Sequence, residues 1–462
     1  MIRQIAANAK ITDEMRMEAI EAAVPYETVQ AVVVEHGLQR QRKRKLSAEM
    51  GLLLGIGMNL YSHLSLAHVL HKLVQGLRYV WPEPDFQPAS KGAISQLRYA
   101  QGARPMVDLF HRVCQPMATA QTVGAFVGGL RLMGIDGTSE NLADTPDILR
   151  VFGRHGSGRG EAAFPQGQAV YLVELGTHAI VDAELWPVHT SERMGATRLL
   201  RSLGAGMLVL WDSGLHSHAM ITRTLARGAH FLGCLPPRIR LKYECALPDG
   251  SWRVSLPPPK ELRGGQKIPL RLIEYTITDP ALPGYGKRRR LLTSLLEEEH
   301  FPALQLALVY HERWEAELTI DETDSHQRLP YRPFRSRRPV GLIQEFYGLL
   351  IAHYVIRKLI LDAALLAQVD PDRISFTNAL RILQAAVPEF QQTDPAQHPA
   401  LYQRLLQDIA SFALLPRKTR TNPRVVKRKM STFDKKRPQH RHWPQPSVPF
   451  QEAIALTKPY WT

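Results

Sequence analysis

"AGMLVLWDSG", residues 205–214, is an apolar run that ends at Asp212. A short continuous apolar run bounded by glycine is typical of a buried strand. The next stretch, "SHAMITRTLARGAHFLGCLP" at 217–236, has the spacing of a helix followed by a second apolar strand. Strands that alternate with helices predict an α/β layer architecture. Because open α/β sheets bind ligands outside the carboxyl ends of their strands, Asp212 is a candidate site residue.

A second apolar run, "GLRLMGIDGT" at 129–138, predicts another core strand whose carboxyl end carries Asp136. One acid at a strand end is usually a turn residue or a helix cap. Two acids on core strands of a basic protein favour a different interpretation, because paired carboxylates repel unless a cation or a proton relieves them. A hard divalent metal ion takes oxygen ligands of this kind together with substrate phosphate.

The remaining periodicity predicts helices before and after this core. Two helical patterns separated by Gly102, within 90–113, suit either a DNA-reading helix–turn–helix or an ordinary helical pair. "QAVYLVELGTHAIVDAELW" predicts a hairpin, and the basic tail has little apolar periodicity, so we expect it to be loosely ordered. The predicted segments are a helical N-terminal DNA-binding domain (1–122), the first part of the α/β core (123–236), a β-rich insertion (237–290), the second part of the core with its helix (291–340), a helical C-terminal region (341–416) and a basic tail (417–462).

The charge balance indicates a polyanionic partner. The 462 residues include 58 Lys and Arg against 43 Asp and Glu, a formal net charge of +15. Such a field favours nucleic acid first and an anionic membrane surface second. The positive charge is clustered in "RQRKRK" at 40–45 and in 417–441.

Cysteine usage and apolar runs indicate the compartment. Three cysteines without a Cys-x-x-Cys spacing fit a reducing environment and form no zinc motif. The longest apolar stretch, "MGLLLGIGMNLY" at 50–61, is shorter than the roughly 18 residues of a membrane-spanning helix. We therefore expect a cytoplasmic protein without a membrane partner, associated with the nucleoid when bound to DNA.

"YHERWEAELTIDETDSH", residues 310–326, concentrates acids in this basic chain. A solvated helix with internal salt bridges is one interpretation. At 3.6 residues per turn, however, Tyr310, Arg313, Glu317 and position 324 share one narrow stripe of a helix. Such a stripe suits a site in which Glu317 binds a metal ion while Arg313 and Tyr310 hold phosphate oxygens.

Five other side chains have less specific interpretations. Glu312 and Glu315 fall off the stripe, so we expect them to be solvated. His178 and His189 lie in or near the predicted hairpin, where plain polar contacts are commoner than metal ligation. Trp252, in the predicted insertion, is either a core residue of that region or a platform that stacks on a DNA base.

Three blocks in this order, "GIDGT", "LVLWDSG" and "YHERWEAELTIDE", resemble those of the DDE transposases of insertion sequence family four. The last block of that family reads Tyr-x2-Arg-x3-Glu-x6-Lys. The stretch "RPFRSRRPVGLIQEFYGLLIAHY" at 332–354 adds to the resemblance, which extends from about residue 25 to about residue 430.

The resemblance implies an α/β fold with an RNase H-like catalytic core and a β-rich insertion, flanked by helical N-terminal and C-terminal regions. It implies that Asp136, Asp212 and Glu317 form a catalytic triad that holds two Mg²⁺ or Mn²⁺ ions. Tyr310 and Arg313 would contact DNA beside the scissile phosphate. The implied function is cut-and-paste transposition, in which a homodimer binds terminal inverted repeats, cleaves a strand and joins its 3′-OH to target DNA.

One position departs from the family signature, because its lysine falls on Asp324. Arg328, one turn further along, is a candidate to replace the lysine, and Arg335, Arg337 and Arg338 are candidate phosphate contacts. The reversed charge leaves a second interpretation open, a catalytically impaired DNA-binding regulator of the element. A third is an RNase H-like nuclease without strand transfer.

Overall fold

The computed structural model describes residues 17–39, 46–80, 89–157, 160–258, 267–329, 332–414, 425–426, 434–442 and 445–457. These residues form two compact units. Unit 1 comprises the described residues of Met1–Ala125, Ile135–Ser202 and Glu315–Leu415. Unit 2 comprises those of Phe126–Gly134, Leu203–Trp314 and Pro416–Thr462.

The N-terminal part of unit 1 is helical, as expected. Serine hydroxyls cap three of its helices by accepting a backbone hydrogen bond three residues later. Gly102, with φ 72°, separates the last two helices in the predicted place. The helices are α1 (Tyr26–Glu35), α2 (Ala48–Leu60), α3 (Leu66–Leu73), α4 (Lys91–Gln101) and α5 (Arg104–Val113).

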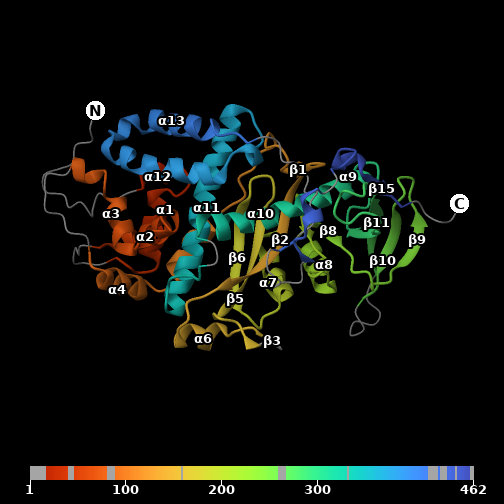
Figure 1. Cartoon of the computed structure of the whole chain (residues 1–462), viewed down its shortest axis with the longest axis horizontal. Helices are drawn as coiled ribbons and strands as arrows, with labels where there is room; N and C mark the ends of the chain where they lie inside the picture. The colour runs from red at the N-terminus through yellow and green to blue at the C-terminus, as the bar shows by residue number, and fades with distance from the viewer. Residues whose placement is uncertain are drawn as a thin grey trace. The chain divides into compact units, whose positions relative to one another are not determined.

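The C-terminal part of unit 1 contains α11 (Pro339–Ala367), α12 (Phe376–Gln392) and α13 (His398–Ala410). Helix α2, formed by the longest apolar run, is almost wholly buried and lies beside α11 (Figure 1). Glycine allows this close approach, because a Cβ on Gly348 would lie 2.5 Å from the carbonyl oxygen of Gly55. Nδ2 of Asn59 donates hydrogen bonds to the carbonyls of Gly55, at 2.9 Å, and Glu345, at 3.3 Å. The apolar run therefore forms a helix of the protein core.

Among the described residues, three strands form the larger sheet of unit 1, and β3 (Gly156–Ser157) and β4 (Gly160–Glu161) form a separate pair. The predicted hairpin is present, with β5 (Gln166–Glu174) antiparallel to β6 (Ala179–Pro187). Strand β5 neighbours β2 (Leu130–Asn141), which runs through both units. Helices α6 (Pro146–Phe152) and α7 (Glu192–Leu199) complete this part of the chain.

Unit 2 continues from β2 in the order β2-β7-β8-β12-β11-β10-β9. The first two pairings, β2 with β7 and β7 with β8, are parallel. The strands and helices of this part alternate, as the sequence predicted. The later pairings are antiparallel and include the β-rich insertion. The elements are β7 (Met207–Trp211), α8 (His218–Ala226), β8 (His230–Cys234), β9 (Lys242–Ala246), β10 (Trp252–Leu256), β11 (Ile268–Ile277) and β12 (Arg289–Thr293).

The acidic stretch is not one regular helix, so the expectation of a single stripe is wrong. After α9 (Ala303–Val309) the chain tightens into the 3₁₀ turn η5 (Tyr310–Arg313), and α10 (Trp314–Asp321) follows. It then widens into the π-helical segment η6 (Glu322–Gln327). Because the number of residues per turn differs among these helices, positions spaced for 3.6 residues per turn do not stay on one face.

The described part of the C-terminal tail is ordered, contrary to expectation. Strand β15 (Ile454–Leu456) pairs antiparallel with β11. The ring of Phe450 packs edge-on against that of His311, with centroids 4.5 Å apart. Residues 40–45 and most of 417–441 lie outside the described residues.

None of the helices in the described part of the chain combines the length and the apolar character that crossing a membrane requires.

Replacing Gly348 by Ala tests the contact between α2 and α11. The added methyl group would overlap a backbone carbonyl, which cannot move like a flexible side chain, so we expect a loss of about 1–3 kcal/mol in the free energy of unfolding. Gly92→Ala in α4 is the matched control, because its Cβ would meet only Oγ of Ser90, at 3.8 Å. In urea unfolding, the control should leave the free energy of unfolding unchanged or raise it slightly. Equal midpoints for the two variants would contradict the close packing.

Candidate active site

Asp212 follows β7 directly, as predicted, and belongs to unit 2. Its Oδ1 accepts hydrogen bonds from the backbone nitrogens of Gly214, at 2.8 Å, and Leu215, at 3.1 Å. The side chain is exposed. Two backbone donors therefore orient an exposed carboxylate at the carboxyl end of a buried strand.

Asp136 lies within β2 rather than at its end, so the expectation of a strand end is wrong here. The ladder with β7 nevertheless stops before it, because the last pair joins Gly134 to Leu210. Asp136 is two residues after Gly134, and Asp212 is two residues after Leu210. The half-buried carboxylate of Asp136 accepts a hydrogen bond from the backbone nitrogen of Gly137 at 2.9 Å.

Tyr310 and Arg313, the first two signature residues, lie in η5 of unit 2. The Tyr310 ring is buried, and its hydroxyl donates to the carbonyl of Trp211 at 3.4 Å. Burial raises the pKa of Tyr310 far above its usual value, so the hydroxyl keeps its proton. Trp211 is itself stacked on Phe231, with ring centroids 5.0 Å apart. Tyr310 thus contacts the strand end that immediately precedes Asp212.

Glu317, the third predicted acid, lies in α10 and is half-buried. Glu317 and Asp136 belong to unit 1, and Asp212 belongs to unit 2.

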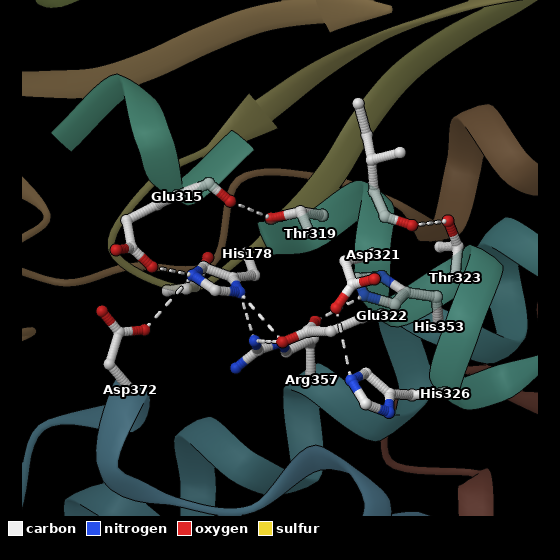
Figure 2. Close-up of polar contacts among 12 residues, drawn as sticks. His178, Glu315, Thr319, Asp321, Glu322, Thr323, His326, His353, Arg357 and Asp372 are labelled. Carbon is white, nitrogen blue, oxygen red and sulfur yellow. Dashed lines mark hydrogen bonds and ion pairs between the residues drawn. The ribbon is translucent and has the colours of Figure 1, made fainter. Parts of the chain in front are cut away.

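His178, in the turn between β5 and β6, is fully buried and faces charged groups on both sides of its ring (Figure 2). Its Nε2 lies 2.7 Å from Oε2 of Glu315 and 3.3 Å from Oδ1 of Asp372. Its Nδ1 lies 3.2 Å from Oε1 of Glu322, whose Oε2 accepts a hydrogen bond from Nε of Arg357 at 2.8 Å. Burial and Arg357 disfavour a charged imidazole, but the three carboxylates outweigh them and raise the pKa of His178 to about 9.

Among the described residues, one group of three metal-binding side chains has ligand atoms that all lie within 4.8 Å of one another: His178, Glu315 and Asp372. It contains none of the three predicted acids. The expectation that Glu315 is solvated is wrong, because only 15% of its side chain is exposed. The one signal for this group in the sequence was His178, two residues after Gly176 in a predicted hairpin turn. No pattern in the sequence indicates that Asp372 lies next to it.

Asp324, where the family signature has lysine, lies in a second cluster of unit 1. Arg328 pairs with Glu140 there, with Nη1 2.8 Å from Oε2, and the Tyr171 hydroxyl donates to Oε1 of Glu140 at 3.1 Å. Burial, together with repulsion from Glu140, raises the pKa of Asp324 to about 8. Near pH 7 the Asp324 carboxyl therefore carries a proton, so the departure from the signature does not place a full negative charge at this position.

The guanidinium groups of two predicted DNA contacts, Arg328 and Arg335, form bonds within unit 1. Arg328 is mostly buried in the cluster around Glu140 and lies over the Phe334 ring. The guanidinium of Arg335 donates to the carbonyls of Leu64, at 2.7 Å, and Met58, at 2.6 Å. Both side chains therefore make bonds that stabilise unit 1.

The remaining predicted DNA contacts differ in their exposure. Arg337 is exposed. Arg338 is also exposed and lies over the Tyr99 ring, 4.9 Å from its centroid. Trp252 is half-buried on β10 and packs edge-on against Tyr243, with centroids 5.0 Å apart.

The raised pKa of Asp324 predicts a pH-dependent stability. The unfolded chain loses this proton near pH 4 and the folded chain only near pH 8, so stability falls as the pH rises between these values. Asp324→Asn removes the ionisation, and we expect it to be more stable than the parent at pH 8 by on the order of 2 kcal/mol, with a smaller gain at pH 5. Urea unfolding at the two pH values measures this gain. Asp147→Asn, which changes a half-exposed acid on α6, is the control. The same pH trend in both variants would refute the assignment.

Two segments of the chain match known protein families. Residues 14–111 match the family described as insertion element 4 transposase N-terminal. Residues 129–355 match the family described as transposase DDE domain. The second match, together with the sheet and its helical flanks, confirms the expected α/β fold with an RNase H-like core.

Individual proteins are similar to this chain over different shares of its length. The transposase InsG for insertion sequence element IS4 of Escherichia coli (strain K12) is 28% identical over 437 residues, which are 92% of this chain and 92% of that protein. The putative transposase InsZ of the same strain is 26% identical over 148 residues, 32% of this chain and 50% of that protein. A chain in the cryo-EM structure of a piggyBac transposase synaptic complex with hairpin DNA has a TM-score of 0.44 and 13% identity, covering 86% of this chain and 85% of that one.

The two family matches lie in the order and at the positions that the sequence blocks predicted, and the InsG similarity extends over nearly the whole chain. The chain therefore belongs to the DDE transposases of the insertion sequence IS4 family, which are metal-dependent enzymes that cleave DNA.

Proposed function

We propose that this transposase binds the terminal inverted repeats of its own element, cleaves a strand at each end and joins the freed ends to target DNA. The observation that carries the proposal is the parallel ladder of β2 and β7. Asp136 and Asp212 each follow its last pair by two residues. Both acids therefore follow the same end of one parallel ladder at the same distance in sequence, which supports them as two members of one triad.

Glu317 is the third member in this proposal. The donor set fits hard divalent cations, because all three side chains offer carboxylate oxygens, the ligands that Mg²⁺ and Mn²⁺ prefer. Two such ions would supply a nucleophilic oxygen at neutral pH and would stabilise the attacking and leaving oxygens of an in-line displacement. Asp212 is oriented for such a role by two backbone donors on one of its oxygens.

The reaction has two steps that use the same centre. In the first, a water oxygen bonds to the scissile phosphorus and the P–O3′ bond breaks, leaving a 3′-OH and a 5′-phosphate. In the second, the oxygen of that 3′-OH bonds to a phosphorus of the target strand while the P–O3′ bond of the target breaks, leaving a 3′-OH on the target. Arg313 would hold a phosphate oxygen beside the scissile bond, and Tyr310, through its contact with Trp211, would support the strand end that carries Asp212.

DNA binding is assigned to accessible cations. Arg337 and Arg338 are exposed directly before α11 and would contact phosphates, and the Trp252 ring would stack on a displaced base. Arg328 and Arg335 are not assigned this role, because their guanidinium groups bond within unit 1. We propose a homodimer on DNA, since the two ends of an element present two copies of the repeat.

A catalytically impaired regulator is not favoured. That interpretation depended on the negative charge of Asp324, which the raised pKa removes near pH 7.

Asp136→Asn tests the proposed triad. The amide keeps the size of the side chain but loses its charge, so we expect nicking of a DNA fragment carrying the element's end to fall by at least 100-fold with Mg²⁺ or Mn²⁺, while binding in a gel-shift assay stays within twofold. Asp147→Asn, on α6, should nick at the parental rate. Parental nicking by Asp136→Asn would exclude Asp136 as a ligand.

The basic tail is expected to contribute to affinity through counterion release. Replacing Lys427, Arg428 and Lys429 by Ala removes three charges while leaving β15 in place, so we expect weaker DNA binding. The slope of log K against log[salt] should become less steep by up to about 3. The double substitution Lys427→Arg and Lys429→Arg, which keeps the charge, should leave the slope unchanged. An unchanged slope in the triple Ala variant would show that these three side chains make no phosphate contacts.

A further inference from the structure

His178 has a backbone conformation that is uncommon for residues with a side chain. Its φ is 59°, in the left-handed region, and among the described residues the other non-glycine with a positive φ is Gln368, which ends α11. His178 has no exposed surface. Such a conformation persists only where the surroundings determine it, and it is concentrated at functional sites.

Three ligand atoms converge at this histidine from separate elements of unit 1. His178 comes from the hairpin turn, Glu315 from α10 and Asp372 from the short turn η7 (Pro371–Arg373), as Figure 2 shows. All three ligand atoms lie within 4.8 Å of one another. Oδ1 of Asp372 is buried, and no donor among the described residues makes a hydrogen bond to it. Burying a carboxylate oxygen without a donor costs free energy, which a bound cation would offset.

The opposite nitrogen of the ring has the partner that a metal-binding histidine usually has. Nδ1 of His178 lies 3.2 Å from Oε1 of Glu322 and also contacts Nη2 of Arg357. The Glu322 carboxylate fixes the ring and increases the basicity of Nε2. Glu322 is held in turn by Nε of Arg357, at 2.8 Å, and by Nε2 of His353, at 3.0 Å. A histidine between a carboxylate on one side and two oxygen ligands on the other has the outer shell of a metal site.

The charges of the cluster also fit a divalent cation. Three carboxylates, those of Glu315, Asp372 and Glu322, are near one guanidinium, that of Arg357. With a protonated imidazole, which pairs with Glu315 and Asp372, the cluster keeps one net negative charge. A divalent ion that replaces the imidazole proton would bring the net charge of the cluster to zero.

We propose that His178, Glu315 and Asp372 bind one Zn²⁺ or Mn²⁺ ion, separate from the ions of the triad. The imidazole ligand disfavours Mg²⁺, which prefers all-oxygen sites, and favours first-row transition metals. Three protein ligands leave a fourth position for water.

The two distances from Nε2 of His178 to the carboxylate oxygens can be compared with those of a tetrahedral site. Metal–ligand bonds of about 2.0–2.2 Å in a tetrahedron separate ligand atoms by roughly 3.3–3.6 Å. The 3.3 Å between Nε2 of His178 and Oδ1 of Asp372 already matches this separation. The 2.7 Å between Nε2 and Oε2 of Glu315 is a hydrogen-bond distance and must lengthen when the ion enters.

The ion would have a positioning role rather than a catalytic one. Glu315 precedes Glu317 by two residues in α10, so an ion that joins Glu315 to the hairpin and to η7 would fix the start of the helix that carries Glu317. The site therefore couples metal content to the orientation of a triad residue without contacting DNA.

The test uses the full-length chain with Asp136→Asn and Asp212→Asn, which weakens binding at the triad, after removal of metal with a chelator. Titration with ZnCl₂ or MnCl₂ in a calorimeter should show one saturable site per chain, and adding Co²⁺ should produce a d–d absorption band with an imidazole ligand. Adding Asp372→Asn should lower the affinity at least tenfold and remove the band. Adding Asp321→Asn, an exposed acid of the same helix outside the group, should change neither.

Two results would overturn the proposal. One is the absence of any saturable binding, which would leave the group as an ion-pair network around a protonated histidine. The other is equal affinity in the Asp372→Asn and Asp321→Asn proteins. A second ligand variant, His178→Asn, keeps the test sound if Asp372→Asn unfolds, because asparagine tolerates the left-handed backbone. Since neither readout is DNA cleavage, loss of this site is distinguishable from failure of the proposed function.

Discussion

The parallel ladder between β2 and β7 is the constraint on which the catalytic arrangement depends. Its register joins Arg131 to Met207 at one end and Gly134 to Leu210 at the other. In a sheet buried on both faces, a slip of one residue would turn every side chain to the opposite face, so the packing of apolar side chains fixes the register. Residues such as Leu132 and Leu208, which are buried in the core, therefore decide where the acids that follow them are placed.

The elements with a strong local signal were predictable. The run that became β7, the helix and strand after it, and the paired helices around Gly102 each have one dominant periodicity, and each formed in the expected place. The β-rich insertion was recognisable for the same reason, since proline and glycine break its short strands. The end of β2 was not, because a strand continues as long as a neighbour pairs with it, and β5 supplies that neighbour beyond the ladder with β7.

The least predictable features are those in which charges are buried. A count at 3.6 residues per turn cannot foresee that the chain tightens at Tyr310 and widens at Glu322, since tertiary packing decides those changes. Glu322 illustrates the difficulty: its partners, Arg357 and His178, are far away in sequence, so a buried ion network looks like solvated charge in the sequence. Removing one partner of such a network typically costs about 3–5 kcal/mol, because the other charge stays buried alone.

The same reasoning explains why a departure from the family signature need not mean loss of activity. The effect of an acidic residue at a signature position depends on its surroundings, because they determine whether it is ionised. Asp324 lies beside Glu140 and Arg328 in unit 1, where a neutral carboxylic acid is the favoured form near pH 7. The chemical type of a residue therefore does not by itself decide the charge at its position.

The pairing of β15 with the far end of β11 has a consequence for shortened copies of the gene. Tyr275, Thr276 and Ile277 bond to a strand that lies almost at the C-terminus. A premature stop codon shortly before residue 454 would spare every proposed catalytic residue but expose the backbone groups of these three residues as a bare strand edge. Such edges recruit strands from other molecules, so the truncated products would be prone to self-association.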